Sequence, residues 1–154
     1  MQQRFHAPHK RYGPEEMSPE LREAMTHVKR AAVQHRNNHI GTEHLLFGLT
    51  AEPDSATRLL ESAGVSPSDV HDDVGARLTM GASQAAERIA WTPYSRKAIA
   101  LAEARSEEAG AGRIGCDDLL VGLALVGRGS RPVSWRTRDS GPEPLRPFGL
   151  IARW

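Results

Sequence analysis

The chain has 154 residues, of which 39% are hydrophobic and 25% are charged, and these proportions are typical of one globular domain. A net charge of +1 at pH 7 excludes a protein that binds nucleic acid through an overall positive charge. The single cysteine excludes an internal disulfide, and no apolar run approaches the roughly 18 residues of a membrane helix. The start of the chain lacks the hydrophobic region of a secretory signal, so we expect a cytoplasmic protein without membrane contact.

The first expected element is a helix that follows a flexible leader. Residues 1–16 mix proline, glycine, histidine and charged side chains without periodicity, which predicts the leader. Ser18-Pro19 then predicts a helix start, because the serine hydroxyl can cap free amides and proline fits the first helical position. Apolar residues at spacings of three and four extend this helix to about Asn37-Asn38; they are Leu21, Ala24, Met25, Val28 and Ala32.

Three shorter helices are expected next. Thr42 is the predicted cap of the first of them, whose leucines point inward. The second runs from about residue 55 to residue 63 and ends at Gly64, a predicted left-handed cap. The third begins at Ser66-Pro67 and is expected to bury Val70, Val74 and Leu78. Residues 79–90 then form a link.

The series of helices starts again at Thr92-Pro93. The first helix of this second series has a thinner apolar stripe and ends near Gly110 and Gly112, so we expect it to pack more weakly. Another helix follows as far as Val126. Four prolines and four glycines beyond it exclude two further regular helices and predict an irregular, basic tail over residues 127–154.

These two series are copies of one another at a constant offset of 74 residues. The stretch Ile40–Leu49 returns as Ile114–Leu123, and the same offset carries Ser18-Pro19 onto Thr92-Pro93. The pattern predicts an all-α domain built from a tandem repeat of a four-helix unit, over residues 17–80 and 91–126, with the second copy incomplete. Because such a unit cannot bury its apolar face alone, the copies are expected to pack around a pseudo-two-fold axis.

The string Asn38-His39-Ile40-Gly41-Thr42-Glu43-His44-Leu45-Leu46-Phe47-Gly48-Leu49, placed after a Ser-Pro helix, resembles the N-terminal (Clp R) domain of Clp-family AAA+ unfoldases, above all ClpC. The resemblance is close over residues 17–80, fair over residues 91–126 and absent beyond. It implies a tandem four-helix repeat that docks adaptor and client proteins. No Gly-x-x-x-x-Gly-Lys-Ser/Thr string is present, so we expect a non-catalytic binding module of the Clp proteolytic system, without ATPase chemistry or a cofactor.

The resemblance also implies a ligand. In ClpC this domain receives phosphorylated arginine in two pockets, one in each repeat, each using the Ser or Thr that opens the first helix and the Glu of the Gly-Thr-Glu-His string. Those positions are Ser18 and Glu43 in the first copy, and Thr92 and Asp117 in the second. Cys116-Asp117-Asp118 replaces Thr-Glu-His in the second copy, which departs from the family pattern.

The chemistry of such a pocket follows from the ligand. The phosphoryl group of phosphoarginine suits a hydroxyl and free N–H groups at a helix N-terminus, and its guanidinium suits a carboxylate. Because the Asp117 side chain is one methylene shorter than that of Glu43, we expect the pocket of the first copy to dominate.

Plainer interpretations stand beside these. The hydroxyls of Ser18, Thr42 and Thr92 could cap helices and do no more, and Glu43 could merely complement a helix dipole. A second functional hypothesis is a decoy that sequesters cyclic peptide antibiotics directed at ClpC, through an apolar surface at Met17 and Trp91. Packing against the first helical turn is the preferred interpretation of Trp91, although its place beside the presumed pocket keeps both open.

The remaining candidates for chemistry are weak. His35, His39 and His44 match no zinc pattern, so no metal site is expected. Cys116 is interpreted as a structural thiol in preference to a nucleophile. The arginines of the tail could contact nucleic acid, but a solvated tail is the preferred interpretation.

Overall fold

The computed structural model describes residues 12–82 and 89–129, with side chains as far as residue 127. The first copy contains the 3-10 helix η1 (Pro14–Glu16), the helices α2 (Pro19–Gln34), α3 (Thr42–Leu49), α4 (Ser55–Ser62) and α5 (Pro67–Arg77), and the strand β1 (His39–Ile40). The second copy contains the strand β2 (Ala90–Trp91) and the helices α6 (Pro93–Glu108) and α7 (Cys116–Gly129). The prediction of an all-α domain is confirmed.

The predicted helix starts are mostly confirmed. The hydroxyl of Ser18 accepts from the amide of Leu21 at 3.1 Å, and that of Thr92 accepts from the amide of Ser95 at 3.2 Å. Thr42 is a correction, because it is the first helical residue and Gly41 occupies the cap position. Gly41 has no side chain to accept a bond, and the Nδ1 atom of His44 accepts from the Gly41 amide instead, at 2.9 Å.

The helix ends follow the backbone conformation. Gly64, Gly110 and Gly112 have positive φ angles of 80°, 68° and 84°, as predicted for left-handed caps. Helix α2 ends at Gln34, before the predicted Asn37-Asn38, and Arg36 has a φ of 55°. The turn that leads into β1 therefore begins earlier than the apolar spacing indicates.

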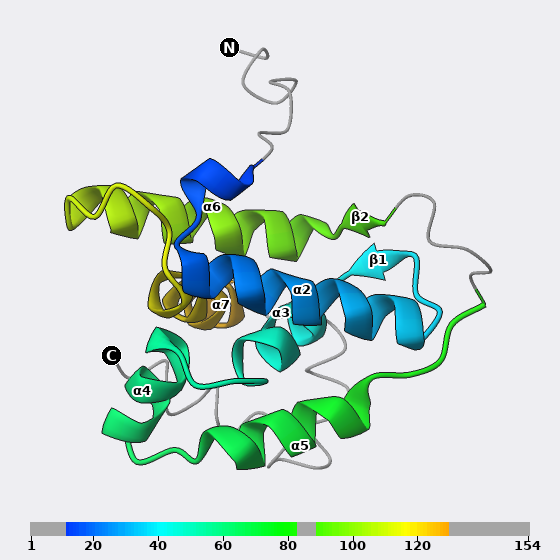
Figure 1. The fold of residues 1–154 in the computed structure, drawn as a ribbon. Coiled ribbons are helices and arrows are strands. Elements are labelled where there is room, and N and C mark those ends of the chain that lie inside the picture. Colours follow the sequence, from blue (N-terminus) through cyan, green and yellow to red (C-terminus); the bar gives the residue numbers. More distant parts are fainter. Residues whose placement is uncertain (1–11, 83–88, 130–154) are drawn as a thin grey trace.

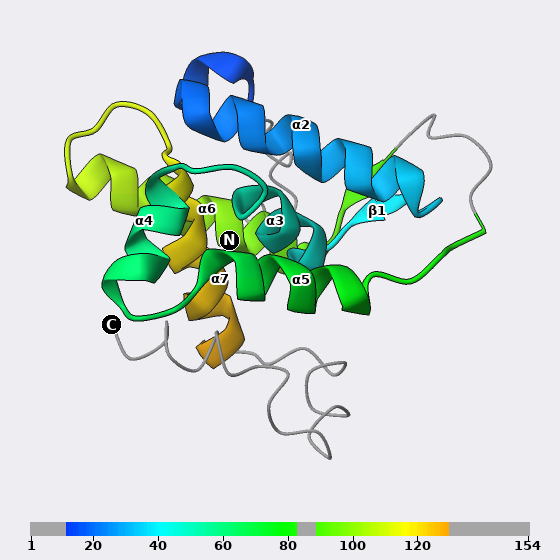
Figure 2. The ribbon, with the colours of Figure 1, turned by 60° about the horizontal axis from the view of Figure 1, so that its bottom comes forward.

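The equivalent helices α3 and α7 lie at the centre of the molecule. Helix α3 contacts α2, α5 and α7, and Figure 2 shows it between α2 and α5. Helix α7 contacts α6, α4, α3 and α2. Each of the two central helices contributes three fully buried leucines to the single core: Leu45, Leu46, Leu49, Leu119, Leu120 and Leu123.

A glycine lets each central helix approach its partner closely. A Cβ atom at Gly48 of α3 would lie 2.8 Å from the carbonyl oxygen of Ala24 in α2. At the equivalent position of the second copy, a Cβ at Gly122 of α7 would overlap the carbonyl oxygen of Ala98 in α6. The two glycines of the repeated string are thus needed for helix contact and not for a turn.

The two copies are joined by a pair of short parallel bridges. Ile40 of β1 pairs with Trp91 of β2, and Ile114 pairs with Met17. The two pairs are equivalent, because Ile40 corresponds to Ile114 and Met17 to Trp91 at the offset of 74 residues. In each copy, the residue just before the Ser-Pro or Thr-Pro helix start pairs with the isoleucine of the other copy. In Figure 1 the β1–β2 pair lies beside the C-terminal end of α2, and the start of α2 lies at the opposite end.

Several boundaries differ from the predictions. The flexible leader was expected to reach residue 16, but η1 is part of the fold, since the Glu16 carbonyl accepts from the Ile114 amide at 2.8 Å. The expected thinner apolar stripe of the second copy is seen, because Ile99 is the one buried apolar side chain of α6 larger than alanine, whereas α2 buries three such side chains. Leu78 is only half-buried, because it caps the end of α5.

Helix α7 continues to Gly129, beyond the predicted limit at Val126. The rest of the predicted tail lies outside the described residues, as does most of the leader.

Candidate functional site

The four predicted site residues lie in two groups, each built from both copies. Thr92 donates its amide to the carbonyl of Ile40 at 3.0 Å, which places it beside the segment that leads to Glu43. Ser18 donates its amide to the carbonyl of Ile114 at 2.8 Å, which places it beside the segment that leads to Asp117. The predicted pairing within one copy, Ser18 with Glu43 and Thr92 with Asp117, is therefore wrong.

The physical reason is the antiparallel packing of helices inside one copy. Ser18 caps the N-terminus of α2, whereas β1 and the start of α3 follow the C-terminus of α2. Sixteen residues of helix span about 24 Å, so Ser18 and Glu43 lie too far apart to share a ligand side chain. A repeat in sequence does not require that each site be made by one repeat.

The first group, named here the Glu43 site, consists of Gly41, Thr42 and Glu43 with Trp91, Thr92 and Arg96. Glu43 is half-buried in the first turn of α3, and no described residue donates a hydrogen bond to its carboxylate. Thr92 caps α6. The Nη1 atom of Arg96 donates to the Trp91 carbonyl at 2.6 Å, and further guanidinium donors are left after that bond. An open carboxylate thus lies near a helix N-terminus and a cation.

The second group, named the Asp117 site, consists of Gly115, Cys116 and Asp117 with Met17, Ser18 and Arg22. Here the carboxylate is already used by the fold. The Asp117 Oδ2 atom accepts from Arg105 at 3.2 Å, and its Oδ1 atom accepts from the Ser55 hydroxyl at 3.2 Å. The Asp117 amide donates to the Ser55 Oγ atom at 2.9 Å. Ser55 at the start of α4 and Arg105 of α6 therefore occupy the Asp117 groups that a ligand would need.

The difference between the sites lies in their neighbours as well as in side-chain length. Ala31 stands where the second copy has Arg105, so α2 supplies no equivalent cation to Glu43. In the second copy Arg105 also pairs with Asp118, whose Oδ2 atom accepts from the Gly115 amide at 2.8 Å. In the first copy His44 takes the role of Asp118.

His44 is a buried imidazole that holds the loop before the Glu43 site. Because its Nδ1 atom accepts from the Gly41 amide, its Nε2 atom carries the proton and donates to the Asn37 Oδ1 atom at 2.9 Å. Asn37 in turn donates to the Thr79 carbonyl at 3.2 Å. Burial, with smaller contributions from His39 and His35, lowers the pKa of His44 to about 4.

Cys116 and Asp54 form a second buried polar contact, under the start of α4. Burial raises the pKa of the Cys116 thiol, and the neighbouring Asp54 carboxylate raises it further. Burial also raises the pKa of Asp54, although the hydrogen bond from the Thr57 amide opposes that shift. A thiol with a raised pKa and no exposed surface is a poor nucleophile, which agrees with its interpretation as a structural group.

The expected apolar ligand surface at Met17 and Trp91 is only partly present. Met17 has 6% of its surface exposed and lies in the bridge to Ile114, so it offers almost no surface to a ligand. Trp91 is half-buried and packs against the core. The decoy hypothesis thus loses one of its two residues.

Four residues of these sites were not singled out for function by the sequence. Arg22 and Arg96 occupy equivalent positions, 74 residues apart, and each donates to the carbonyl of the bridge residue before its helix, Met17 or Trp91. Ser55 and Arg105 carried no signal, because they reach Asp117 from other helices.

The chain matches the model of the Clp repeat (R) N-terminal domain over residues 16–131. The chain belongs to this family. Among curated relatives, it is 32% identical over 99 residues to the chaperone protein ClpB of Oceanobacillus iheyensis, covering 64% of this chain and 12% of that protein. It is 30% identical over 94 residues to the negative regulator of genetic competence ClpC/MecB of Bacillus subtilis, covering 60% of this chain and 12% of that protein.

Solved structures show the same fold. The N-terminal domain of ClpD from Arabidopsis thaliana superposes with a TM-score of 0.59 at 18% identity, covering 89% of this chain and 95% of that domain. The N-domain of ClpV from Vibrio cholerae superposes with a TM-score of 0.62 at 16% identity, covering 96% of both chains. Within residues 12–82 and 89–129, no helix is long and apolar enough to cross a membrane.

Clp N-domains are binding modules of Clp ATPases. The match to this Clp R chain covers only 12% of the length of each of the two relatives named above.

Proposed function

We propose that this Clp R chain is a non-catalytic module that binds adaptor or client proteins of a Clp ATPase, and that its Glu43 site receives a phosphorylated arginine side chain. The observation that carries the proposal is the half-buried Glu43 carboxylate, which has no partner among the described residues and lies beside the capped N-terminus of α6.

The ligand chemistry fits the groups at this site. The guanidinium end of phosphoarginine would donate to the Glu43 carboxylate, a charge-assisted contact. The phosphoryl end would accept from the Thr92 hydroxyl, which donates to Ser95 in the free protein, and from free donors of Arg96. Both ends of the ligand are charged, so each contact is stronger than one between neutral groups.

We propose that the Asp117 site binds no phosphoarginine, because the Asp117 carboxylate already has two partners and not merely because its side chain is short. A ligand guanidinium would have to displace both Arg105 and the Ser55 hydroxyl from Asp117. Lengthening the side chain by Asp117→Glu would leave both of those partners in place, so this change alone is not expected to create a second site.

Calorimetric titration of the whole chain with free phosphoarginine tests the proposal. The parent protein should bind one equivalent. Glu43→Gln should weaken binding by about ten-fold or more, because it removes a charge-assisted contact of about 1.5 to 3 kcal/mol. Asp117→Asn should change binding little, and Glu61→Gln, at an exposed position on α4, is the matched control.

Two results would count against this scheme. Equal losses for Glu43→Gln and Asp117→Asn would contradict the inequality of the sites. Absence of binding by the parent protein would remove phosphoarginine as the ligand, and co-purification with a Clp ATPase or adaptor would then be the test of the wider binding role.

A further inference from the structure

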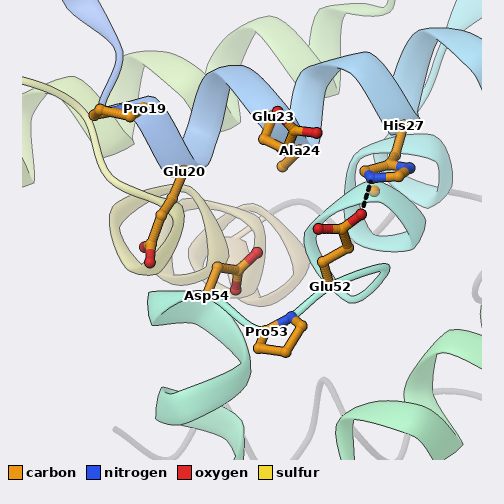
Figure 3. A pocket seen from close by; sticks show the side chains of 9 residues that line it. Pro19, Glu20, Glu23, Ala24, His27, Glu52, Pro53 and Asp54 are labelled. Carbon is orange, nitrogen blue, oxygen red and sulfur yellow. Dashed lines mark hydrogen bonds and ion pairs between the residues drawn. The ribbon is translucent and has the colours of Figure 1, made fainter.

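An acidic groove of about 270 Å³ lies between α2 and the loop that joins α3 to α4, and one end of it borders the Asp117 site, where Asp54 contacts Cys116. Figure 3 shows carboxylates from both sides of the groove facing its interior. Its lining includes four carboxylate side chains and one imidazole but no lysine or arginine. Such a concentration of negative charge attracts cations.

The carboxylates at one end of this groove are committed to the start of α4. Glu20 accepts from the Ser55 amide at 3.1 Å and pairs with Arg58 at 3.4 Å. Asp54 caps the same helix, accepting from the Thr57 amide at 2.9 Å. These two groups are therefore structural.

At the other end of the groove, the side chains of Glu23, His27 and Glu52 lie close together. Glu23 and His27 stand four residues apart on α2, so they share one face of the helix. Glu52 reaches them from the facing loop, and its Oε2 atom lies 3.0 Å from the His27 Nε2 atom. One donor atom from each of the three side chains lies within 4.8 Å of the other two. No described residue donates a hydrogen bond to Glu23.

The loop that carries Glu52 is fixed at both ends. The Thr50 hydroxyl donates to the Leu46 carbonyl at 2.9 Å, and Asp54 is held by its cap. Pro53 restricts the backbone between these anchors. Glu52 is therefore held opposite α2, with its carboxylate already in contact with His27.

We propose that Glu23, His27 and Glu52 bind a divalent transition-metal ion of the zinc class. Zinc takes histidine nitrogen and carboxylate oxygen at about 2.0 to 2.2 Å, so neighbouring ligand atoms of a tetrahedral site lie about 3.3 to 3.6 Å apart. In the structure a hydrogen bond of 3.0 Å joins the His27 and Glu52 atoms; a bound metal would replace the proton between them and widen the separation toward that value, and rotation of the exposed Glu23 side chain would bring in the third ligand. Three protein ligands leave a fourth position for water or a partner's side chain.

The donor set selects the class of metal. Imidazole suits zinc, cobalt and nickel, whereas magnesium and calcium prefer oxygen ligands throughout. No metal site was expected from the sequence, in which His35, His39 and His44 match no zinc pattern. The group of Glu23, His27 and Glu52 could not be found in that way, because Glu52 is separated from α2 by the whole of α3.

The test is a titration of the full chain, free of any affinity tag and stripped with a chelator. Zinc binding is followed by calorimetry, and cobalt is followed by its visible absorption, which reports nitrogen and oxygen coordination. We expect one equivalent of zinc and a higher melting temperature in its presence. His27→Gln should weaken binding by at least roughly ten-fold, the loss that even removal of an outer-shell group can cause. Glu23→Gln and Glu52→Gln should also weaken it.

Matched controls separate this site from other sources of affinity. His39→Gln removes an exposed histidine elsewhere, and a double change of His6 and His9 to Gln removes the histidines near the N-terminus; neither should alter binding. Circular dichroism verifies the fold of each variant. The proposal is overturned if zinc does not saturate at one equivalent, if binding survives His27→Gln, if it is lost with His6 and His9, or if magnesium and calcium bind equally well.

Discussion

At the residue scale, His44 is an imidazole whose two nitrogens are both used by the fold. It is 3% exposed, and it links the Gly41 amide to the side chain of Asn37. Protonation would place a hydrogen on Nδ1, where the Gly41 amide already donates. Burial adds the cost of a charge in a medium of low polarity, and the pKa falls to about 4.

The lowered pKa predicts a pH-dependent stability. Between pH 6.5 and about 4 the unfolded chain binds a proton at this position and the folded chain does not, so stability is full above pH 6.5 and is lost as the pH falls. The slope should be about 1.4 kcal/mol per pH unit, or about 3 kcal/mol across the interval. Urea unfolding of the parent at several pH values measures it.

A variant isolates this contribution from those of other groups. His44→Gln should be less stable than the parent at pH 7 but should lose less stability on acidification. His39→Gln removes only one of the smaller contributions to the lowered pKa of His44, so it should keep most of the parent's slope. The raised pKa of Asp54 acts in the opposite direction, because it favours the folded state as the pH falls. Equal slopes in the parent and in His44→Gln would show that His44 does not cause the dependence.

At the scale of the helices, the contact of each central helix with its neighbour depends on a glycine. Gly48 of α3 packs on Ala24 and Val28 of α2, and Gly122 of α7 packs on Ala98 and Ala102 of α6. The four neighbours are related by the repeat offset. Close approach at these points brings the buried leucines of both central helices into one core.

Substitution of these glycines should therefore destabilise the protein. Gly48→Ala and Gly122→Ala would drive a methyl group into backbone atoms of the facing helix, so each should cost about 1 to 3 kcal/mol or more. Gly75→Ala in α5 is the control, since its Cβ would meet only the Phe47 ring, at 3.0 Å, while alanine is favoured over glycine by about 1 kcal/mol in a helix. Urea unfolding compares the three, and similar stabilities would contradict the close-approach role.

At the scale of the whole molecule, the Glu43 site and the Asp117 site exist only because the two copies are joined, whereas the proposed zinc site lies within the first copy. In the Glu43 site, the first copy supplies Glu43 and the second copy supplies Thr92, and the bridge between Ile40 and Trp91 joins them. The other bridge joins Ser18 to the segment before Asp117.

This crossed arrangement predicts which pairs of residues are coupled in ligand binding. If phosphoarginine contacts Glu43 and Thr92 together, the double variant of Glu43→Gln and Thr92→Val should deviate from additivity by about 0.5 to 3 kcal/mol. The pair Glu43→Gln and Ser18→Ala should be additive within about 0.5 kcal/mol, because those residues belong to different sites. Calorimetry of the single and double variants measures both cycles.

Thr92→Ser, which keeps the helix cap, separates ligand contact from stability in this cycle. Coupling between Glu43 and Ser18 in place of Thr92 would restore the pairing within one copy and contradict the crossed site.

Much of the local structure was predictable. The caps at Ser18 and Thr92, the left-handed glycines and the all-α repeat follow from side-chain type and spacing, and the resemblance of the Ile-Gly-Thr-Glu-His-Leu-Leu string indicated the family. The prediction that Ser18 and Glu43 share a pocket was wrong, because two residues of the same repeat do not have to lie close together in space. The engagement of Asp117 was not predictable, because Ser55 lies 62 residues away in the chain.

The sequence by itself determined where most helices begin and which faces are apolar, because these properties depend on residues a few positions apart; the ends of α2 and α7 differ from its predictions. Only the tertiary structure decided which helix ends meet, and hence that Glu43 is left open while Asp117 is held by Arg105 and Ser55. The antiparallel packing of α2 on α3 sends the two helix starts of one copy to opposite ends of the molecule. A binding site at such an end therefore needs the other copy.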